Sequence, residues 1–145
     1  MKEIKFFVPG VPAPGGSKKA FKHPATGKIM VVDACSRNKP WRERVASFAY
    51  DHKPNDLIKT AIELSIDFIM PRPKGHYGTG KNSSKLKPSA PKFCTKKPDA
   101  TKLTRALEDA LTGIIWKDDD QVVKQVIRKH YGDSPGALVT IREIC

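Results

Sequence analysis

The sequence lacks the long apolar runs and the cysteine pairs that are typical of membrane and secreted proteins. Its longest apolar stretches, such as residues 114–116, are far shorter than the roughly 20 residues that span a bilayer. Glu3 and Lys5 interrupt the N-terminal apolar positions that a secretion signal would need. None of the cysteines has CxxC spacing, which argues against a disulfide framework and a structural zinc site; they are Cys35, Cys94 and Cys145. We expect a soluble cytoplasmic protein with no membrane contact and no small-molecule cofactor.

Acidic residues are also scarce. The chain has 27 Lys and Arg against 15 Asp and Glu, which gives a formal charge of +12. Such a charge attracts a polyanion whatever the fold, so nucleic acid is the first partner to consider, although solvated lysine faces give the same composition. From residue 71 to 98, Pro, Gly and Ser are frequent and no acidic residue occurs. We interpret this segment as a flexible basic loop, because such long loops are usually functional or disordered.

The pattern of apolar residues predicts one domain that covers residues 1–145, built from strands and two helices. In residues 61–70 the even-numbered positions are apolar, which predicts a strand with one buried face. Helical spacing predicts helices over residues 40–50 and 99–113. The inward residues of the first helix are expected to be Trp41, Val45, Phe48 and Ala49. Further strands are expected at residues 4–8, 28–32, 122–131 and 137–144, the last two as a hairpin. The expected fold class is α/β (α+β), a mixed β-sheet of about four to five strands with two main helices.

Carboxylates stand at both ends of the second predicted helix. Asp99 opens that helix, and an acidic triplet at residues 118–120 follows it. Carboxylates that hold Mg²⁺ near a cation activate water and neutralise charge in phosphodiester hydrolysis, so these residues are candidates for a nuclease site. Simpler interpretations stay open, with Asp99 as a helix N-cap and the triplet as a solvated turn. Arg105, four residues before Asp109, has the spacing of an ordinary intrahelical ion pair.

One string of residues is more specific than the composition. Residues 97–99 (Lys-Pro-Asp) are followed by Leu103, by residues 105–113, which include Asp-Ala-Leu-Thr-Gly, and by residues 118–122 (Asp-Asp-Asp-Gln-Val). This order resembles the RusA family of Holliday-junction resolvases, whose core reads approximately KPDxDxLxK, then DALT, then DDxQV. The resemblance implies a RusA-like fold, a homodimer, and paired magnesium-dependent nicks in four-way DNA junctions, with Mn²⁺ as an alternative ion. It also suggests a phage or prophage source.

Carried over position by position, the resemblance assigns catalytic roles to Asp99, Asp119 and Arg105, and metal binding to Asp99, Asp119 and Asp118. Arg105 replaces the family's lysine. It keeps a permanent charge that stabilises developing negative charge, but it cannot donate a proton near neutral pH. Thr101 replaces the second aspartate of the motif, and a neutral hydroxyl binds Mg²⁺ more weakly than a carboxylate does.

The threonine leaves alternatives open. In the first alternative, a carboxylate from elsewhere in the chain completes the metal site, and the candidates are Asp67, Asp109 and Asp118. Without such a carboxylate, the chain is a branched-DNA-binding protein that does not cleave. A generic basic nucleic-acid-binding module is the remaining alternative, because it needs only the basic loop.

Lysines near the carboxylates and in the basic loop are expected to bind phosphates without preference for base sequence. They are Lys18, Lys19, Lys74, Lys81, Lys85, Lys87, Lys92, Lys96, Lys97 and Lys102. The loop aromatics His76, Tyr77 and Phe93 either stack on bases or pack locally, and we favour local packing.

Overall fold

The computed structural model describes residues 3–16, 18–33 and 35–144. In these residues the strands are β1 (Glu3–Pro9), β2 (Lys18–Lys22), β3 (Ile29–Asp33), β4 (Ile62–Met70), β5 (Val122–Tyr131) and β6 (Gly136–Glu143). The α-helices are α1 (Asn38–Asp51) and α2 (Ala100–Leu111). Short 3-10 helices are η1 (Lys74–His76), η2 (Gly80–Asn82) and η3 (Asp119–Gln121).

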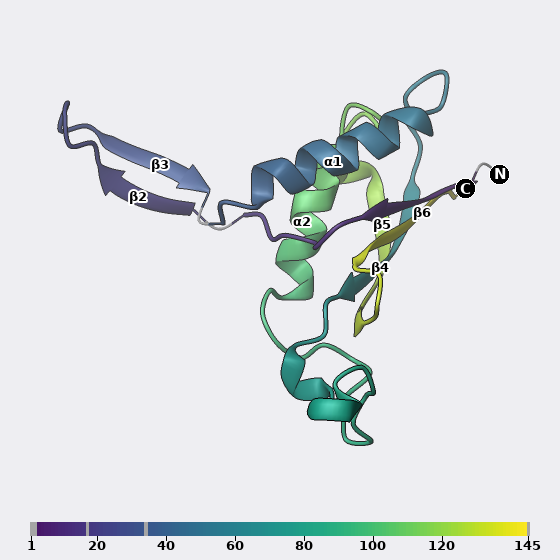
Figure 1. Cartoon of the computed structure of the whole chain (residues 1–145). Helices are drawn as coiled ribbons and strands as arrows, with labels where there is room; N and C mark the ends of the chain where they lie inside the picture. The colour runs from purple at the N-terminus through teal and green to yellow at the C-terminus, as the bar shows by residue number, and fades with distance from the viewer. Residues whose placement is uncertain (1–2, 17, 34, 145) are drawn as a thin grey trace.

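A four-stranded mixed sheet has the order β1-β6-β4-β5 (Figure 1). β6 is antiparallel to both β1 and β4, whereas β4 and β5 are parallel. Parallel neighbours need a long crossover connection, and residues 71–121 provide it with the basic loop, α2 and the acidic turn. The predicted fold class is confirmed, and the candidate catalytic residues Asp99, Arg105 and Asp119 all lie within this one crossover.

The predicted hairpin between the last two strands is wrong. β5 and β6 both pair with β4, which lies between them. The even-numbered residues of β4 from Ile62 to Met70 are all buried. A central position in the sheet covers this apolar face, and β4 has that position between β6 and β5. The connection after β5 passes the end of β4, where the Gly132 amide donates to the Met70 carbonyl at 3.1 Å.

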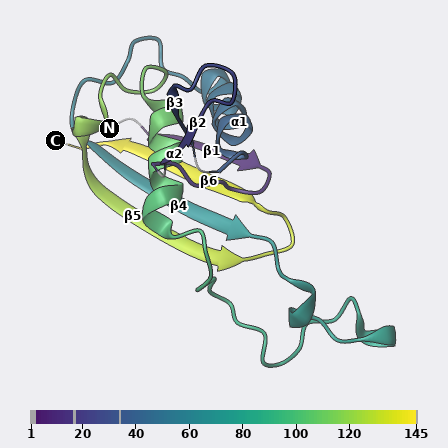
Figure 2. The same cartoon turned by 90° about the vertical axis from the view of Figure 1, so that its left-hand side faces the viewer.

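The helices α1 and α2 cover one face of the sheet (Figure 2). α1 contacts α2 and β1, and α2 contacts β5. The predicted inward face of α1 is confirmed, because Trp41, Val45 and Ala49 are buried and Phe48 packs partly buried against the core. The residues that α2 buries are Leu103, Thr104, Ala106, Leu107, Ala110 and Leu111. The opposite side of α2 lines a cleft.

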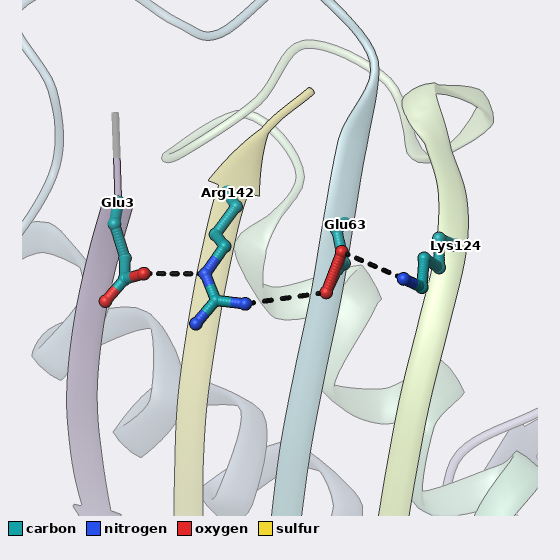
Figure 3. Close-up of polar contacts among 4 residues, drawn as sticks. All are labelled: Glu3, Glu63, Lys124 and Arg142. Carbon is teal, nitrogen blue, oxygen red and sulfur yellow. Dashed lines mark hydrogen bonds and ion pairs between the residues drawn. The ribbon is translucent and has the colours of Figure 1, made fainter. Parts of the chain in front are cut away.

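The face of the sheet away from the helices carries a row of charges (Figure 3). Arg142 Nε lies 2.6 Å from Glu3 Oε2, and Arg142 Nη1 lies 3.6 Å from Glu63 Oε1. Lys124 Nζ lies 3.4 Å from Glu63 Oε2. The row crosses β1, β6, β4 and β5 in turn. Glu63 is only 15% exposed, but its partners Lys124 and Arg142 are 60% and 44% exposed, and such surface pairs contribute about 0–1 kcal/mol each. The apolar core rather than this row therefore holds the strands together.

Two segments project from this body: the β2–β3 hairpin and the basic loop at residues 71–98 (Figure 1). β3 confirms the strand predicted near residues 28–32, whereas the lysine-rich residues of β2 do not predict a strand. The basic loop returns to the sheet at its end. There the Cys94 amide donates to the Lys129 carbonyl at 3.1 Å, and the Tyr131 amide donates to the Lys92 carbonyl at 2.9 Å.

In the part of the chain that the structure describes, no helix has the length and apolar character needed to cross a membrane. Cys35 and Cys94 are free thiols. Cys145 lies outside the described residues.

Candidate active site

A cleft of about 620 Å³ runs along the side of α2 that does not face the core. α2 contributes Thr101, Arg105 and Glu108, because residues three or four apart lie on the same face of a helix. The acidic turn contributes Asp119, and the loop before β2 contributes residues 15–16. The other lining residues are Lys18, Asn38, Arg42, Ala100, Thr104, Asp109, Gln125 and Ile127. The cleft thus holds two of the predicted catalytic residues, Arg105 and Asp119.

The acidic triplet forms a tight turn directly before β5. Asp118, Asp119 and Asp120 each offer a carboxylate oxygen within 4.8 Å of the others, and all three are exposed. An oxygen of Asp118 accepts a hydrogen bond from the Asp120 amide at 3.0 Å, which fixes the short helix η3. Like charges at this separation repel one another, and a divalent cation relieves that repulsion. The donor set fits Mg²⁺, which prefers carboxylate oxygens.

The carboxylates around Asp119 differ in proton affinity. The hydrogen bond from the Asp120 amide, followed by the one shared with Asp119, lowers the pKa of Asp118. The shared hydrogen bond, followed by desolvation and the charges of its neighbours, raises the pKa of Asp119. Burial, followed by the charges of Asp119 and Asp109, raises the pKa of Glu108. This part of the cleft concentrates negative charge that a proton or a cation compensates.

Gln121 fixes the acidic turn to the segment before β4. Its Nε2 donates to the carbonyls of Ile58 at 2.8 Å and Thr60 at 2.9 Å. Its Oε1 accepts from the amides of Lys117 at 3.0 Å and Asp118 at 2.8 Å. A side-chain amide both donates and accepts, so one residue satisfies backbone groups of two segments. The sequence does not predict this role, because the carbonyl partners lie 63 and 61 residues earlier.

The glycines before β2 let the chain pass close to Arg105. The Gly15 amide donates to the Lys102 carbonyl at 2.9 Å, which holds this loop across α2. Gly16 has a φ of +83°, and a Cβ at this position would lie 2.5 Å from Cδ of Arg105. Glycine tolerates both this backbone conformation and this close approach. The loop therefore limits where the arginine side chain can lie.

Asp99 lies outside the residues that line this cleft. It is the N-cap of α2, and its Oδ1 accepts a hydrogen bond from the Lys102 amide at 2.8 Å. It lines a second hollow of about 540 Å³, together with Arg37, Lys97 and Lys102 among others. The interpretation of Asp99 as a helix N-cap is confirmed by this hydrogen bond. Binding of a single metal ion by Asp99 and Asp119 together stays a prediction.

A family model described as Endodeoxyribonuclease RusA matches residues 9–142 of the chain. The chain belongs to the RusA endodeoxyribonuclease family. The RusA family acts on branched DNA junctions. The chain is also 33% identical to the uncharacterized protein YqaN of Bacillus subtilis (strain 168), in an alignment of 144 positions that covers 97% of this chain and 96% of the relative. The resemblance seen in the sequence motifs is confirmed.

Thr101, which replaces the second aspartate of the RusA motif, lines the same cleft as Asp119. Among the carboxylates considered as replacements, Asp109 lines this cleft as well. Asp67 instead forms an ion pair of 3.5 Å with an arginine of β5, on the sheet face away from the helices. This RusA-family chain therefore keeps acidic side chains further along α2, although it has none at position 101.

Glu108 is a lining carboxylate that the sequence analysis missed. It follows Thr101 by seven residues and Arg105 by three, and this helical spacing is the signal that places all three on one face. The Gln125 side chain of β5 donates to Glu108 Oε1 at 2.5 Å. Among the described residues, no ion pair joins Arg105 to Asp109, so the predicted intrahelical pair is not observed and both side chains line the cleft.

The predicted phosphate-binding lysines lie at the Asp119 cleft, at the hollow of Asp99 and on the projecting segments. Lys18 lines the Asp119 cleft, and Lys97 and Lys102 line the hollow of Asp99. Lys129, which was not predicted, donates to the carbonyls of Lys96 at 2.6 Å and Pro98 at 2.8 Å and so fixes the chain before α2. The other predicted lysines are exposed on the hairpin or the basic loop: Lys19, Lys74, Lys81, Lys85, Lys87 and Lys92.

The aromatic residues of the basic loop differ in their surroundings. His76 packs edge-on against Tyr131, with ring centroids 4.8 Å apart, as favoured from the sequence. Tyr77 forms an isolated bridge with Leu86. Phe93 is exposed, with Lys92 Nζ 5.5 Å from its ring centroid.

Proposed function

We propose that this chain is a Holliday-junction resolvase, a structure-selective endodeoxyribonuclease that makes paired Mg²⁺-dependent nicks in four-way DNA junctions. Its membership of the RusA family supports the reaction class. The observation that carries the proposal is the single cleft lined by Arg105 and Asp119. Phosphodiester hydrolysis needs carboxylates for a metal ion and a cation for the charge that develops on the phosphate, and this cleft offers both.

Asp119 and Asp118 are the proposed metal ligands in the acidic turn, with Asp99 as a third. When bound, Mg²⁺ supplies an activated water and neutralises phosphate charge. Asp109 or Glu108 takes the place of the carboxylate that Thr101 lacks, because both line the cleft of Asp119. Asp99 has to direct its second oxygen to the metal while its first oxygen caps α2.

Arg105 is the proposed phosphate ligand of the cleft. Its planar guanidinium group donates to two phosphate oxygens at once and keeps its charge at every physiological pH. Lys18, at the same cleft, and the exposed lysines of the projecting segments bind the flanking phosphates. Paired nicks need two active sites, so the proposal includes a homodimer whose symmetry relates the two cuts.

The decisive test is incubation with a synthetic four-way junction whose strands are labelled in turn. We expect symmetric nicks in two opposed strands with Mg²⁺ or Mn²⁺, no nicks in EDTA, and no nicks in linear duplex of the same sequence. Equal cleavage of linear duplex would contradict the structure selectivity. Absence of nicks with both metals would contradict the hydrolase proposal, and sedimentation equilibrium measures whether the active species is a dimer.

Thr101 favours a second candidate function, a protein that binds branched DNA without cutting it. A neutral residue at this position weakens metal binding, and an unloaded site still attracts DNA through its lysines. In the same assay this protein would give a retarded junction complex and intact strands. A generic basic module would instead bind junction and duplex with equal affinity.

A further inference from the structure

The most exposed apolar side chains of the β2–β3 hairpin belong to one strand, β3. Ile29 is 76% exposed and Val31 is 64% exposed. Their neighbours across the hairpin on β2 are Lys22 and Ala20, which leave both side chains largely uncovered. Cross-strand neighbours supply most side-chain contacts in a sheet, so the remaining place for such contacts is the open side of β3.

The outer edge of β3 has the composition of a pairing edge. Among the described residues, β3 pairs with β2 alone, in a two-stranded sheet that projects from the body (Figure 1). A lone hairpin is marginally stable in water, and an apolar edge strand is a template for pairing with another chain. Native proteins protect such edges with lysine or proline, and residues 29–33 (Ile-Met-Val-Val-Asp) contain neither. β2, in contrast, has three lysines among its five residues, so the open edge of the hairpin is that of β3.

A second copy of the chain fits this edge. Two antiparallel strands are related by a two-fold axis perpendicular to their sheet, so β3 can pair with β3 of a second copy. A register centred on Val31 uses all five residues of the strand. Its pairs are Val31 with Val31, Met30 with Val32, and Ile29 with Asp33. Val31 then has an apolar neighbour directly opposite, and Ile29 lies diagonally across from the same valine.

The charges of the hairpin are compatible with this pairing, although the whole chain carries +12. In the four-stranded sheet β2-β3-β3-β2 the lysine-rich copies of β2 are the outer strands, about 14 Å apart at roughly 4.8 Å per strand. This separation exceeds the Debye length of about 8 Å at physiological salt, so the lysines of the two copies repel one another weakly. Lys28 precedes β3 at the end of the seam where Asp33 of the second copy stands, so opposite charges meet at both ends.

We propose that β3 is the dimerisation edge of this protein and pairs antiparallel, around Val31, with β3 of a second copy. This inference rests on the proposed function, because it names the surface of the homodimer that paired nicks require. β2 begins at Lys18, which lines the cleft of Asp119, and residues 15–16 just before it pass close to Arg105. The hairpin thus connects each cleft to the two-fold axis, while the lysines of β2 stay accessible to phosphates.

The first test uses the register, because only the residue on the two-fold axis faces its own counterpart. Val31→Cys is made with Cys35→Ser and Cys145→Ser in the full-length protein. Opposed Cα atoms of antiparallel strands are about 4.5–5.5 Å apart, within the range of disulfides, so we expect a disulfide-linked dimer under mild oxidation. Ile29→Cys in the same background is the control, because Ile29 is at least as exposed but faces Asp33 of the second copy. No cross-link through Val31→Cys, or equal cross-linking of both variants, would overturn the inference.

A second test measures the dimer by sedimentation equilibrium without DNA. Val31→Lys places two like charges opposite each other at the centre of the seam, whereas Ala20→Lys places the charge on the outer strand beside Val31. We expect the dissociation constant of the dimer to rise at least about tenfold with Val31→Lys and less than about twofold with Ala20→Lys. Equal changes, or a dimer unchanged by Val31→Lys, would overturn the inference. DNA binding weakened by Val31→Lys with an unchanged dimer would assign the edge to DNA instead.

The inference and the proposed function fail separately. A protein that cross-links through Val31→Cys but nicks no junction keeps the inference and loses the resolvase activity. A dimer that makes paired nicks and tolerates Val31→Lys does the reverse. Where both hold, Val31→Lys should turn paired nicks into single ones, so that a plasmid with an extruded cruciform yields nicked circles in place of linear molecules.

Discussion

At the start of α2, Asp99 accepts a hydrogen bond from the Lys102 amide and shares its hollow with Arg37 and Lys97. Along the second half of the same helix, burial and the charges of Asp119 and Asp109 raise the pKa of Glu108. The Asp99 carboxylate thus lies near an amide and cations. Glu108, Asp109 and Asp119 lie mainly near one another. Asp99 therefore caps α2, whereas burial and the negative charge of the carboxylates near Asp119 raise the proton affinity of Glu108.

The largest expected effect is on the rate of nicking, and it concerns Asp119. Asp119→Asn should lower the nicking rate about a thousandfold, because several kcal/mol of transition-state stabilisation depend on the metal ion. Junction binding in EDTA should stay unchanged or strengthen slightly, because repulsion from phosphates falls. Asp133→Asn is the matched control, since Asp133 is exposed in the connection after β5. Loss of binding together with nicking would indicate a structural role for Asp119.

Next in size is the effect of removing the support of the acidic turn. Gln121→Ala leaves the Ile58 and Thr60 carbonyls and two amides without this partner, so we expect a loss of about 2 kcal/mol in the free energy of unfolding. Gln125→Ala removes a single exposed hydrogen bond and is the control, with a smaller loss. Urea unfolding measures both. Equal losses would mean that Gln121 does not hold the turn.

A carboxylate at position 101, in the first turn of α2, should add negative charge to the cleft that Asp119 lines. Thr101→Asp adds a charge to the cleft that Asp119 lines, and we expect Mn²⁺ affinity to increase about tenfold, or roughly 1.4 kcal/mol. Isothermal titration calorimetry measures the affinity, and Thr101→Asn is the uncharged control of the same size. An equal change in both variants would show that the added charge does not reach the metal.

At Asp99, the N-cap of α2, the expected effect is on stability. Asp99→Ala removes the helix cap and should lower the free energy of unfolding by about 1 kcal/mol, whereas Asp99→Asn should leave it nearly unchanged, because asparagine also caps helices. Thermal unfolding measures the difference. The Asp99→Asn variant also tests metal binding, since loss of nicking at unchanged stability is the result that a ligand role requires.

The smallest expected effect is a pH dependence at Glu108. Its raised pKa means that the folded chain binds this proton more tightly than the unfolded chain, so stability falls as pH rises from the ordinary value of 4.5 through the folded pKa. Glu108→Gln removes this loss and keeps an acceptor for Gln125. The variant should be more stable than the wild type at pH 7 and equally stable well below pH 4.5. A difference of the same size at both pH values would contradict this origin.

Local patterns predicted most of the fold. The alternation of apolar and polar residues in β4 and the helical spacing of apolar residues in α1 and α2 are properties of neighbouring residues. Those elements were therefore predicted within a few positions. The order of the strands in the sheet depends instead on contacts between residues that are far apart in the sequence. Whether β6 pairs with β5 or with β4 depends on which strand has the largest apolar surface to cover, and the turn residues after β5 do not reveal it.

The candidate site was predicted in part, for the same reason. The motif residues Asp119 and Arg105 were named from the sequence, and the structure places both at one cleft. Glu108 and Gln121 were missed, because their importance depends on partners in β5 and in the segment before β4. Asp99 was named as well, and the structure shows its role as the N-cap of α2, whereas metal binding together with Asp119 stays a prediction.

The acidic turn is held by Gln121, whose side chain is a neutral amide. The hydrogen bonds of an uncharged side chain are insensitive to ionic strength and to proton concentration across the physiological range. Acidification therefore changes the charge of the carboxylates, and added salt screens it, while the four hydrogen bonds of Gln121 stay in place. Activity lost under such conditions should return as soon as they are reversed, without any need for refolding.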